Sequence, residues 1–180
     1  MPPPICFRLG ALAKLRAAMA TDPPADLILD PLRGDPYTVK EWLTTFHLCL
    51  VVIDPFTNES AWILDTARRI MAVYAASDVR IGWLVTGTDD EARQFLGPLA
   101  EEFLTFSDPE REAVKALGLE MVPAIVHLNM SGAVEGSAEG WNASSWRAVL
   151  DNLSRILMWS RPTLPLPSDP APYEGTPAVP

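Results

Sequence analysis

The 180-residue chain has few cysteines and few histidines, and this shortage limits the chemistry open to it. Its two cysteines, Cys6 and Cys49, lie far apart in the sequence and form no Cys-x-x-Cys pair. The two histidines, His47 and His127, lie in or beside apolar runs, and no His, Cys or acidic residues recur at the spacing of metal ligands. No Gly-rich phosphate loop and no Ser-His-Asp set is evident. We therefore expect no metal, no cofactor and no catalytic residue.

Basic residues and long apolar runs are also scarce. Fourteen basic against 23 acidic residues give a net charge of −9, which repels nucleic acid and anionic lipid surfaces. The longest apolar run, Leu48 to Ile53, is far shorter than the roughly 20 residues that cross a bilayer. Arg8, Lys14 and Arg16 interrupt the apolar residues near the N-terminus, unlike those of a secretion signal. We expect a cytoplasmic protein with no nucleic-acid partner and no membrane insertion.

Hydrophobic residues make up 48% of the chain and recur with the periods of alternating strands and helices. Two capping boxes, Thr38 to Glu41 and Thr88 to Glu91, mark helix starts. The run from His47 to Asp54 is apolar throughout, as in a central strand covered on both faces. The pattern predicts an α/β fold with a central mixed sheet flanked by helices. Strands are expected at 25–30, 47–54, 79–86, 103–106, 122–129 and 133–137, and helices at 38–46, 60–76, 88–97, 107–118 and 142–159.

The two ends of the chain differ from this central part. Residues 5–20 have helical periodicity, which predicts an extra N-terminal helix. Seven of the last nineteen residues are proline, which predicts a disordered or extended tail. That tail offers PxxP spacings as a polyproline II ligand, or it simply aids solubility. We divide the chain into an N-terminal helix and connecting strand (1–37), a main domain (38–160) and a Pro-rich disordered tail (161–180).

The main domain resembles a known family. The segment GLEMVPAIVHLNMSGAVEGSAEGWNASSWRAVLDNL, which starts at Gly118, resembles the second half of thioredoxin-fold proteins, and VVIDPFTNESAWILDTARRI resembles the strand, active-site loop and long helix of the first half. The helix and strand at 89–106 are similar to those of peroxiredoxins. The resemblance covers residues 38–159 and implies a thioredoxin-like fold in which Pro123 is cis.

The resemblance also implies a lost redox site. Ser60, Ala61, Trp62 and Ile63 fall where active members carry Cys-x-x-Cys, so both sulfurs are missing. Thr57 and Ser60 have the spacing of the peroxiredoxin Thr and Cys, again with serine in place of sulfur, and Asp54 matches the buried acid of thioredoxins. Since disulfide exchange and peroxide reduction both need a thiolate, neither is expected at this position.

What the resemblance leaves is a peptide groove. In active members a substrate peptide lies between three loops, and in this chain the matching residues are Phe56, Ser60, Trp62, Val122, Pro123, Gly140 and Trp141. We expect Trp62 and Trp141 to stand close together at an exposed edge, where tryptophan suits a protein contact. We expect Val122 to pair its backbone with an extended peptide. The alternative is that the tryptophans fold inward as core residues.

Three functions remain open. The leading hypothesis is a redox-inactive thioredoxin-fold protein that binds another protein or peptide as an adaptor or assembly chaperone, similar in architecture to the Cys-less thioredoxin-like chaperones of hydrogenase maturation. The second is an enzyme, either a diverged thiol-disulfide oxidoreductase or peroxidase using Cys6 or Cys49, or a transferase that binds a small thiol in the groove. The third is a structural subunit of a larger complex.

Overall fold

A computed structural model describes residues 19–180 of the chain. The helix expected at 5–20 falls almost wholly outside this part, as does Cys6. Within it, no helix is both long and apolar enough to cross a membrane.

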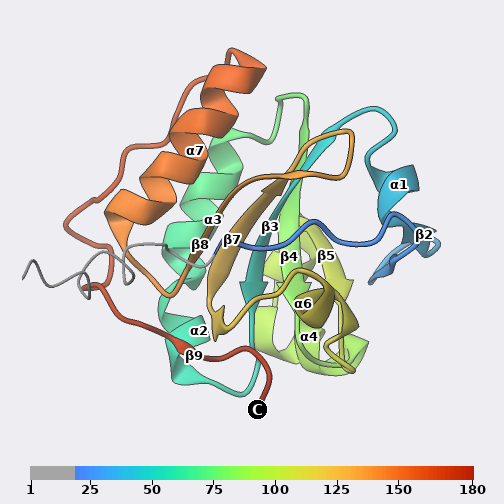
Figure 1. Ribbon diagram of the computed structural model, residues 1–180. Coiled ribbons are helices and arrows are strands. Elements are labelled where there is room, and N and C mark those ends of the chain that lie inside the picture. Colours follow the sequence, from blue (N-terminus) through green and yellow to red (C-terminus); the bar gives the residue numbers. More distant parts are fainter. Residues whose placement is uncertain (1–18) are drawn as a thin grey trace, which may run out of the picture.

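A seven-stranded mixed sheet forms the centre of the molecule (Figure 1). Its three middle strands, β5, β4 and β3, are parallel to one another, and the strands outside them are antiparallel to their neighbours. The expectation of a central mixed sheet is therefore confirmed. In spatial order the strands are β2 (Tyr37–Thr38), β1 (Ile28–Pro31), β5 (Leu104–Ser107), β4 (Val79–Val85), β3 (His47–Ile53), β7 (Ala124–Leu128) and β8 (Val134–Glu139).

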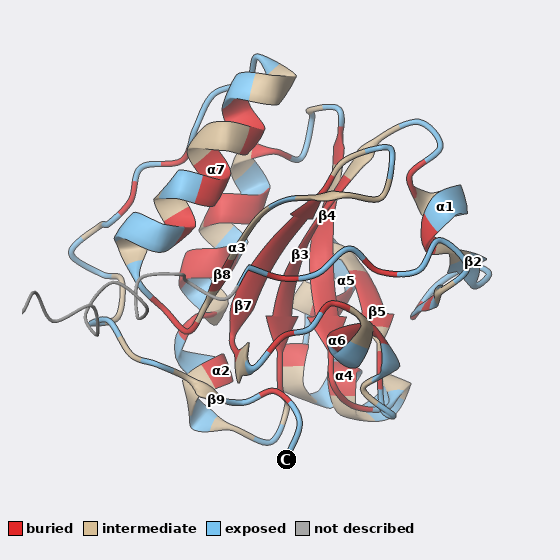
Figure 2. Ribbon diagram, in the orientation of Figure 1, coloured by how far each residue is buried: buried red, intermediate tan, exposed pale blue. Residues whose placement is uncertain are grey.

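Strand β3 lies between β4 and β7 and is buried on both faces, as its apolar run predicts (Figure 2). Its side chains alternate between two cores, because successive residues of a strand point to opposite faces. Cys49, Val51 and Ile53 face one core, and Leu48, Leu50 and Val52 face the other. The sheet thus separates two layers of helices.

The larger core lies under four helices and the smaller one under two. Helices α3 (Leu64–Val73), α4 (Asp89–Leu96), α5 (Leu99–Glu102) and α7 (Ala143–Leu157) contribute side chains to the first core. Helices α1 (Val39–Trp42) and α6 (Glu112–Ala116) contribute to the second. A short helix, α2 (Asn58–Trp62), connects β3 to α3 and lies at the end of the sheet where the functional residues are expected.

Local signals place most helix starts. Both capping boxes form. The Thr38 and Thr88 hydroxyls accept hydrogen bonds from the third helical N–H, and the Glu41 and Glu91 carboxylates accept from the backbone N–H of Thr38 and Thr88. Helix α6 begins later than its expected start at 107, because the Asp108 carboxylate accepts hydrogen bonds from the N–H groups of Ala113 and Val114. Residues 108–111 form a turn before the helix, in which the Arg111 N–H donates to the Asp108 carbonyl at 3.1 Å.

The tail is ordered, which corrects the expectation of disorder at 161–180 (Figure 1). Its carbonyl groups are bonded by arginines of the helices, Arg69 to Thr163 and Arg147 to Leu164. Farther on, a short strand β9 (Thr176–Pro177) pairs with β6 (Met121–Val122). Composition did not indicate this, because the tail's partners lie elsewhere in the chain and prolines reduce the entropy lost on ordering.

Candidate functional site

The loop after β3 and the short helix α2 are the counterpart of the redox loop of active family members, and Ser60 lies fully buried on α2. The Ser60 hydroxyl oxygen accepts hydrogen bonds from the Asp54 N–H at 2.9 Å and from the Thr57 hydroxyl at 3.1 Å. Thr57 precedes α2 but makes no side-chain cap, because its hydroxyl is directed to Ser60 and to the Asp54 carbonyl. Ser60 therefore fastens the loop to the end of β3, and among residues 19–180 no hydrogen bond joins its hydroxyl to a carboxylate or histidine.

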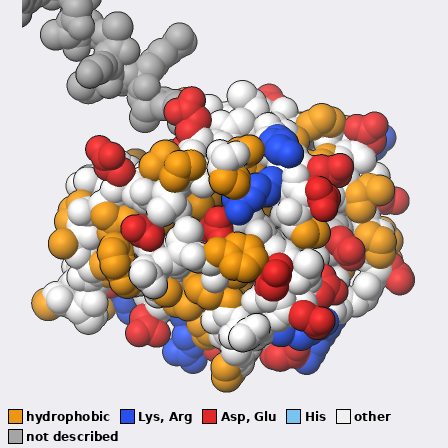
Figure 3. Space-filling model, turned by 90° about the horizontal axis from the view of Figure 1, so that it is seen from below, with side chains coloured by type: hydrophobic (Ala, Val, Ile, Leu, Met, Phe, Trp, Pro, Cys, Tyr) orange, Lys and Arg blue, Asp and Glu red, His pale blue; other side chains and the backbone are white. Residues whose placement is uncertain are grey.

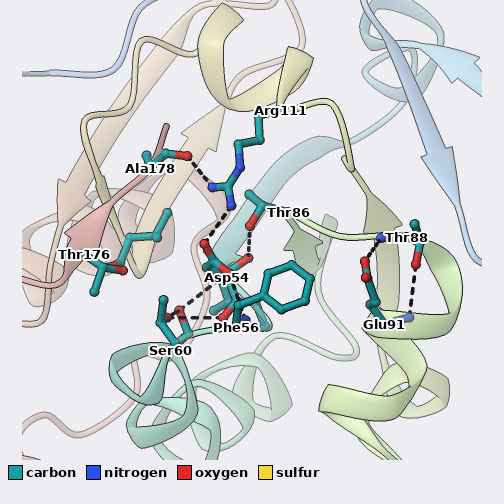
Figure 4. Close-up of polar contacts among 12 residues, drawn as sticks. Asp54, Phe56, Ser60, Thr86, Thr88, Glu91, Arg111, Thr176 and Ala178 are labelled. Carbon is teal, nitrogen blue, oxygen red and sulfur yellow. Dashed lines mark hydrogen bonds and ion pairs between the residues drawn. The ribbon is translucent and has the colours of Figure 1, made fainter. Parts of the chain in front are cut away.

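Asp54 and Arg111 form an ion pair that sequence reasoning missed (Figure 4). The Asp54 carboxylate accepts from Arg111 Nη2 at 2.8 Å and from the Phe56 N–H at 2.9 Å. The two charged side chains are only 7% and 13% exposed. Arg111 has a left-handed backbone (φ 57°), and its other guanidinium nitrogen donates to the Ala178 carbonyl of the tail. One arginine thus joins the end of β3 to the C-terminal segment.

Cys49 has no access to this loop. It lies on β3 opposite His127, whereas Pro123 adjoins the other end of the strand, where Val52 pairs with Ala124. Burial raises the pKa of the Cys49 thiol to about 12, so the group is protonated and inert at neutral pH. Among residues 19–180 no three His, Cys, Asp or Glu side chains gather in a way that would hold a metal ion.

The backbone edge expected to receive a peptide is occupied by the chain's own tail. The Val122–Pro123 bond is cis, and Val122 pairs with Thr176 while Met121 pairs with Pro177. The Ala178 N–H then donates to the Glu120 carbonyl at 2.8 Å. Val122 thus pairs with a strand of its own chain, and the expected pairing with a peptide of another protein stays a prediction.

The two tryptophans do not form the expected exposed pair. Trp62 is 54% exposed, but Trp141 is only 1% exposed. The Trp141 ring packs on Trp146 with centroids 5.2 Å apart, and its Nε1 donates to the Pro170 carbonyl at 2.8 Å. Tyr173 of the tail takes the place beside Trp62, edge to face at 5.4 Å. Trp141 follows the alternative that sequence analysis left open, a core residue.

Gly140 contacts the tail directly. Its backbone is left-handed (φ 66°), and a Cβ at this position would lie 2.5 Å from the Glu174 carbonyl oxygen and 2.7 Å from that of Tyr173. Neither backbone oxygen can retreat easily, so a glycine is required for this close approach. The next residue, Trp141, exchanges two backbone hydrogen bonds with Tyr173, at 2.8 and 2.9 Å.

The tail contacts four of the seven expected residues, Trp62, Val122, Gly140 and Trp141. Ser60 and Trp62 lie on α2, Val122 and Pro123 precede β7, and Gly140 and Trp141 precede α7. Phe56 is 66% exposed beside this group. Phe56, Trp62 and Val179 are all exposed apolar side chains, and we call these three the apolar rim. Figure 3 shows hydrophobic side chains interspersed with acidic ones on the face seen from below.

Comparison with known proteins identifies the fold. No family model matches the chain, and no curated protein matches it in sequence. Three of the many solved structures that match its architecture do so at 10–16% identity, which shows the fold alone: the chain has a thioredoxin-like fold. The first is a candidate thiol:disulfide interchange protein DsbE from Chlorobium tepidum, with 16% identity over 77% of this chain and 97% of that chain and a TM-score of 0.63. The second is a peroxiredoxin Q mutant from Xanthomonas campestris, with 15% identity over 78% of this chain and 98% of that chain and a TM-score of 0.62. The third is the thioredoxin domain of a thiol-disulfide oxidoreductase from Bacteroides vulgatus, with 10% identity over 78% of this chain and 99% of that chain and a TM-score of 0.57.

Proposed function

We propose that this protein binds an extended segment of another protein in the groove beside Pro123 and does not exchange thiols, acting as an adaptor or assembly chaperone. The observation that carries the proposal is the pairing of Val122 with an extended segment, here residues of the tail. Strand addition supplies affinity from backbone hydrogen bonds, and adjacent side-chain contacts supply specificity. This pairing supports a peptide site at the edge beside Pro123, where Ser60 stands in place of the redox thiol.

The absence of thiol chemistry from the described loop supports binding over catalysis. Ser60 replaces the nucleophile, its hydroxyl oxygen accepts two hydrogen bonds, and the nearest carboxylate is engaged by Arg111. Cys49 is protonated and enclosed. The oxidoreductases that share the fold favour the alternative of a diverged thiol enzyme, which would have to use Cys6 or a rearranged Cys49.

The apolar rim supports a protein as the ligand. Phe56 and Trp62 are large and exposed, and Trp62 packs on Tyr173 of the tail that occupies the groove. Tryptophan is enriched among the residues that dominate binding energy in protein interfaces. A partner segment that pairs with Val122 would place its flanking side chains on this rim.

The test compares partner recovery by three full-length proteins at native expression level: wild type, Trp62→Ala and Met158→Ala. Met158 is 92% exposed at the far end of the 15-residue helix α7, so it controls for the loss of an exposed apolar side chain. We expect one partner to be recovered by wild type and Met158→Ala, and to fall at least about tenfold with Trp62→Ala, as for an interface residue worth about 1.4 kcal/mol or more.

Equal recovery by Trp62→Ala, or no partner at all, would overturn the proposal. A second measurement addresses the enzyme alternative with a Cys6→Ser variant. If wild type reduces a disulfide substrate with turnover and Cys6→Ser does not, the protein is a thiol enzyme. We expect both to be inactive and both to recover the partner.

A further inference from the structure

We infer that residues 173–178 are an intramolecular stand-in for the partner segment, and that their pattern, aromatic-x-Gly-Thr-Pro-Ala, describes the segment that displaces them. This inference rests on the proposed function, because it names the sequence that the same groove accepts. The tail would then keep the groove closed in the free protein.

Backbone pairing fixes the tail at three successive places. Tyr173 exchanges two hydrogen bonds with Trp141, Thr176 pairs with Val122, and the Ala178 N–H bonds to Glu120. The pairings join the loop before α7 to the loop before β7. A free segment that bridged both loops would need the same extended backbone.

Side-chain contacts select particular residues at two of these places. The Tyr173 ring packs on Trp62, and its hydroxyl donates to the Glu59 carbonyl at 2.6 Å. Ala178 is fully buried and belongs to the smaller core, and its carbonyl accepts from Arg111. An aromatic residue with a hydroxyl and, five positions later, a small apolar residue are therefore the side chains that fit.

A pair of glycines makes the contact specific. A Cβ on Gly175 would lie 2.3 Å from the Val122 carbonyl oxygen and 3.5 Å from Gly140 Cα, and Gly175 also has a left-handed backbone (φ 89°). A Cβ on Gly140 would strike the tail from the other side. A displacing segment needs glycine where the tail has Gly175, since any side chain there meets a backbone oxygen.

The tail stays tethered when the groove opens. Asp169 is held by Thr66 at 2.8 Å and by Arg69 at 2.6 Å, outside the groove contacts. Residues 173–178 then lie only a few positions from a fixed anchor, at a local concentration of about millimolar. A partner segment must compete with this local concentration, so displacement is set by the differential affinity of the two segments.

The two glycines allow a test in the full-length chain. Substitution at either should free the tail, but only one of the two variants should keep a groove that can still bind a peptide. Gly175→Ala puts the clash on the tail and leaves the groove intact. Gly140→Ala puts the clash on the groove itself. Gly34→Ala is the matched control, since Gly34 has a similar backbone (φ 92°) and no heavy atom near the added Cβ.

Hydrogen exchange of residues 170–180 measures tail attachment, and fluorescence anisotropy measures binding of a labelled synthetic peptide, PAPYEGTPAVP, that copies these residues. We expect slow exchange in wild type and Gly34→Ala, and fast exchange in both other variants. If the tail fills the groove at least nine-tenths of the time and Gly175→Ala frees it fully, the peptide binds Gly175→Ala at least about tenfold more tightly than wild type. We expect Gly140→Ala to bind no peptide.

The outcomes separate this inference from the proposed function. Fast tail exchange in wild type, with peptide bound equally by wild type and Gly175→Ala, overturns the stand-in and leaves the peptide groove in place. Slow exchange in wild type that Gly175→Ala abolishes, without any peptide binding to Gly175→Ala, overturns both. If Gly140→Ala binds the peptide as tightly as Gly175→Ala does, the peptide does not lie against Gly140 as the tail does, and the inference is wrong.

Discussion

Replacement of Arg111 by Met tests the ion pair that joins the candidate site to the tail. The change keeps a long apolar side chain but removes the charge facing Asp54. It also removes the donor to the Ala178 carbonyl. The Asp54 carboxylate would remain in a nearly enclosed position with only the Phe56 N–H as a partner.

The expected cost follows from this burial. Removing one member of a buried ion pair typically costs about 3–5 kcal/mol, because the remaining charge is left uncompensated. Arg68→Met is the matched control, since Arg68 also pairs with a glutamate, Glu102, but both side chains are well exposed. An exposed pair contributes at most about 1 kcal/mol.

Urea unfolding of wild type, Arg111→Met, Arg68→Met, Asp54→Asn and the Asp54→Asn/Arg111→Met double variant provides the measurement. We expect Arg111→Met to lower the free energy of unfolding by at least about 3 kcal/mol, and the double variant to recover part of that loss because no charge is left unpaired. Equal losses in Arg111→Met and Arg68→Met, or additive losses in the double variant, would refute the reasoning.

Three further predictions concern titratable groups. Burial and the neighbouring His47 lower the pKa of His127 from 6.5 to about 4, so between these pH values the unfolded chain binds a proton that the folded chain does not. The free energy of unfolding should be full above pH 6.5 and lower by about 3 kcal/mol at pH 4, and urea unfolding of a His127→Leu variant should lack this pH dependence. With its pKa raised to about 12, Cys49 should resist a thiol reagent in native Cys6→Ser protein and react fully in urea; fast native labelling would contradict its enclosure. Burial alone would raise the pKa of Asp169, but the Leu166 N–H and Arg69 hold it below its ordinary 3.8. Hydrogen exchange should therefore show the tail anchored above pH 3.8 and released as the pH falls through the lowered pKa. Asp169→Asn should release the tail at pH 7 as well.

Local patterns predicted the sheet and most helix starts. The apolar run of β3 identifies a strand buried on both faces, because nothing but a central position can cover it. The Thr38 and Thr88 capping boxes form as expected, since every partner lies within four residues. The cis bond before Pro123 was implied by the family resemblance and is present.

Features that depend on distant partners were not predictable in this way. Trp141 is buried because the tail and Trp146 cover it, and the tail was expected to be disordered. Arg111 is one of several arginines in the sequence, and nothing local marks it as the partner of Asp54, 57 residues away. Composition described the tail as Pro-rich, but its order is determined by arginines and backbone edges in the main domain.

The direction in which the tail runs has a mechanical consequence. From its end inward the tail is held at Ala178, Thr176, Tyr173 and Asp169, one contact after another. Tension applied at the C-terminus would load these contacts singly, as in the opening of a zipper. The parallel strands β3 and β4 share their load over seven paired residues, His47 to Ile53. A complex that pulled on this terminus would therefore strip the tail from the groove at a force far below the one that opens the sheet.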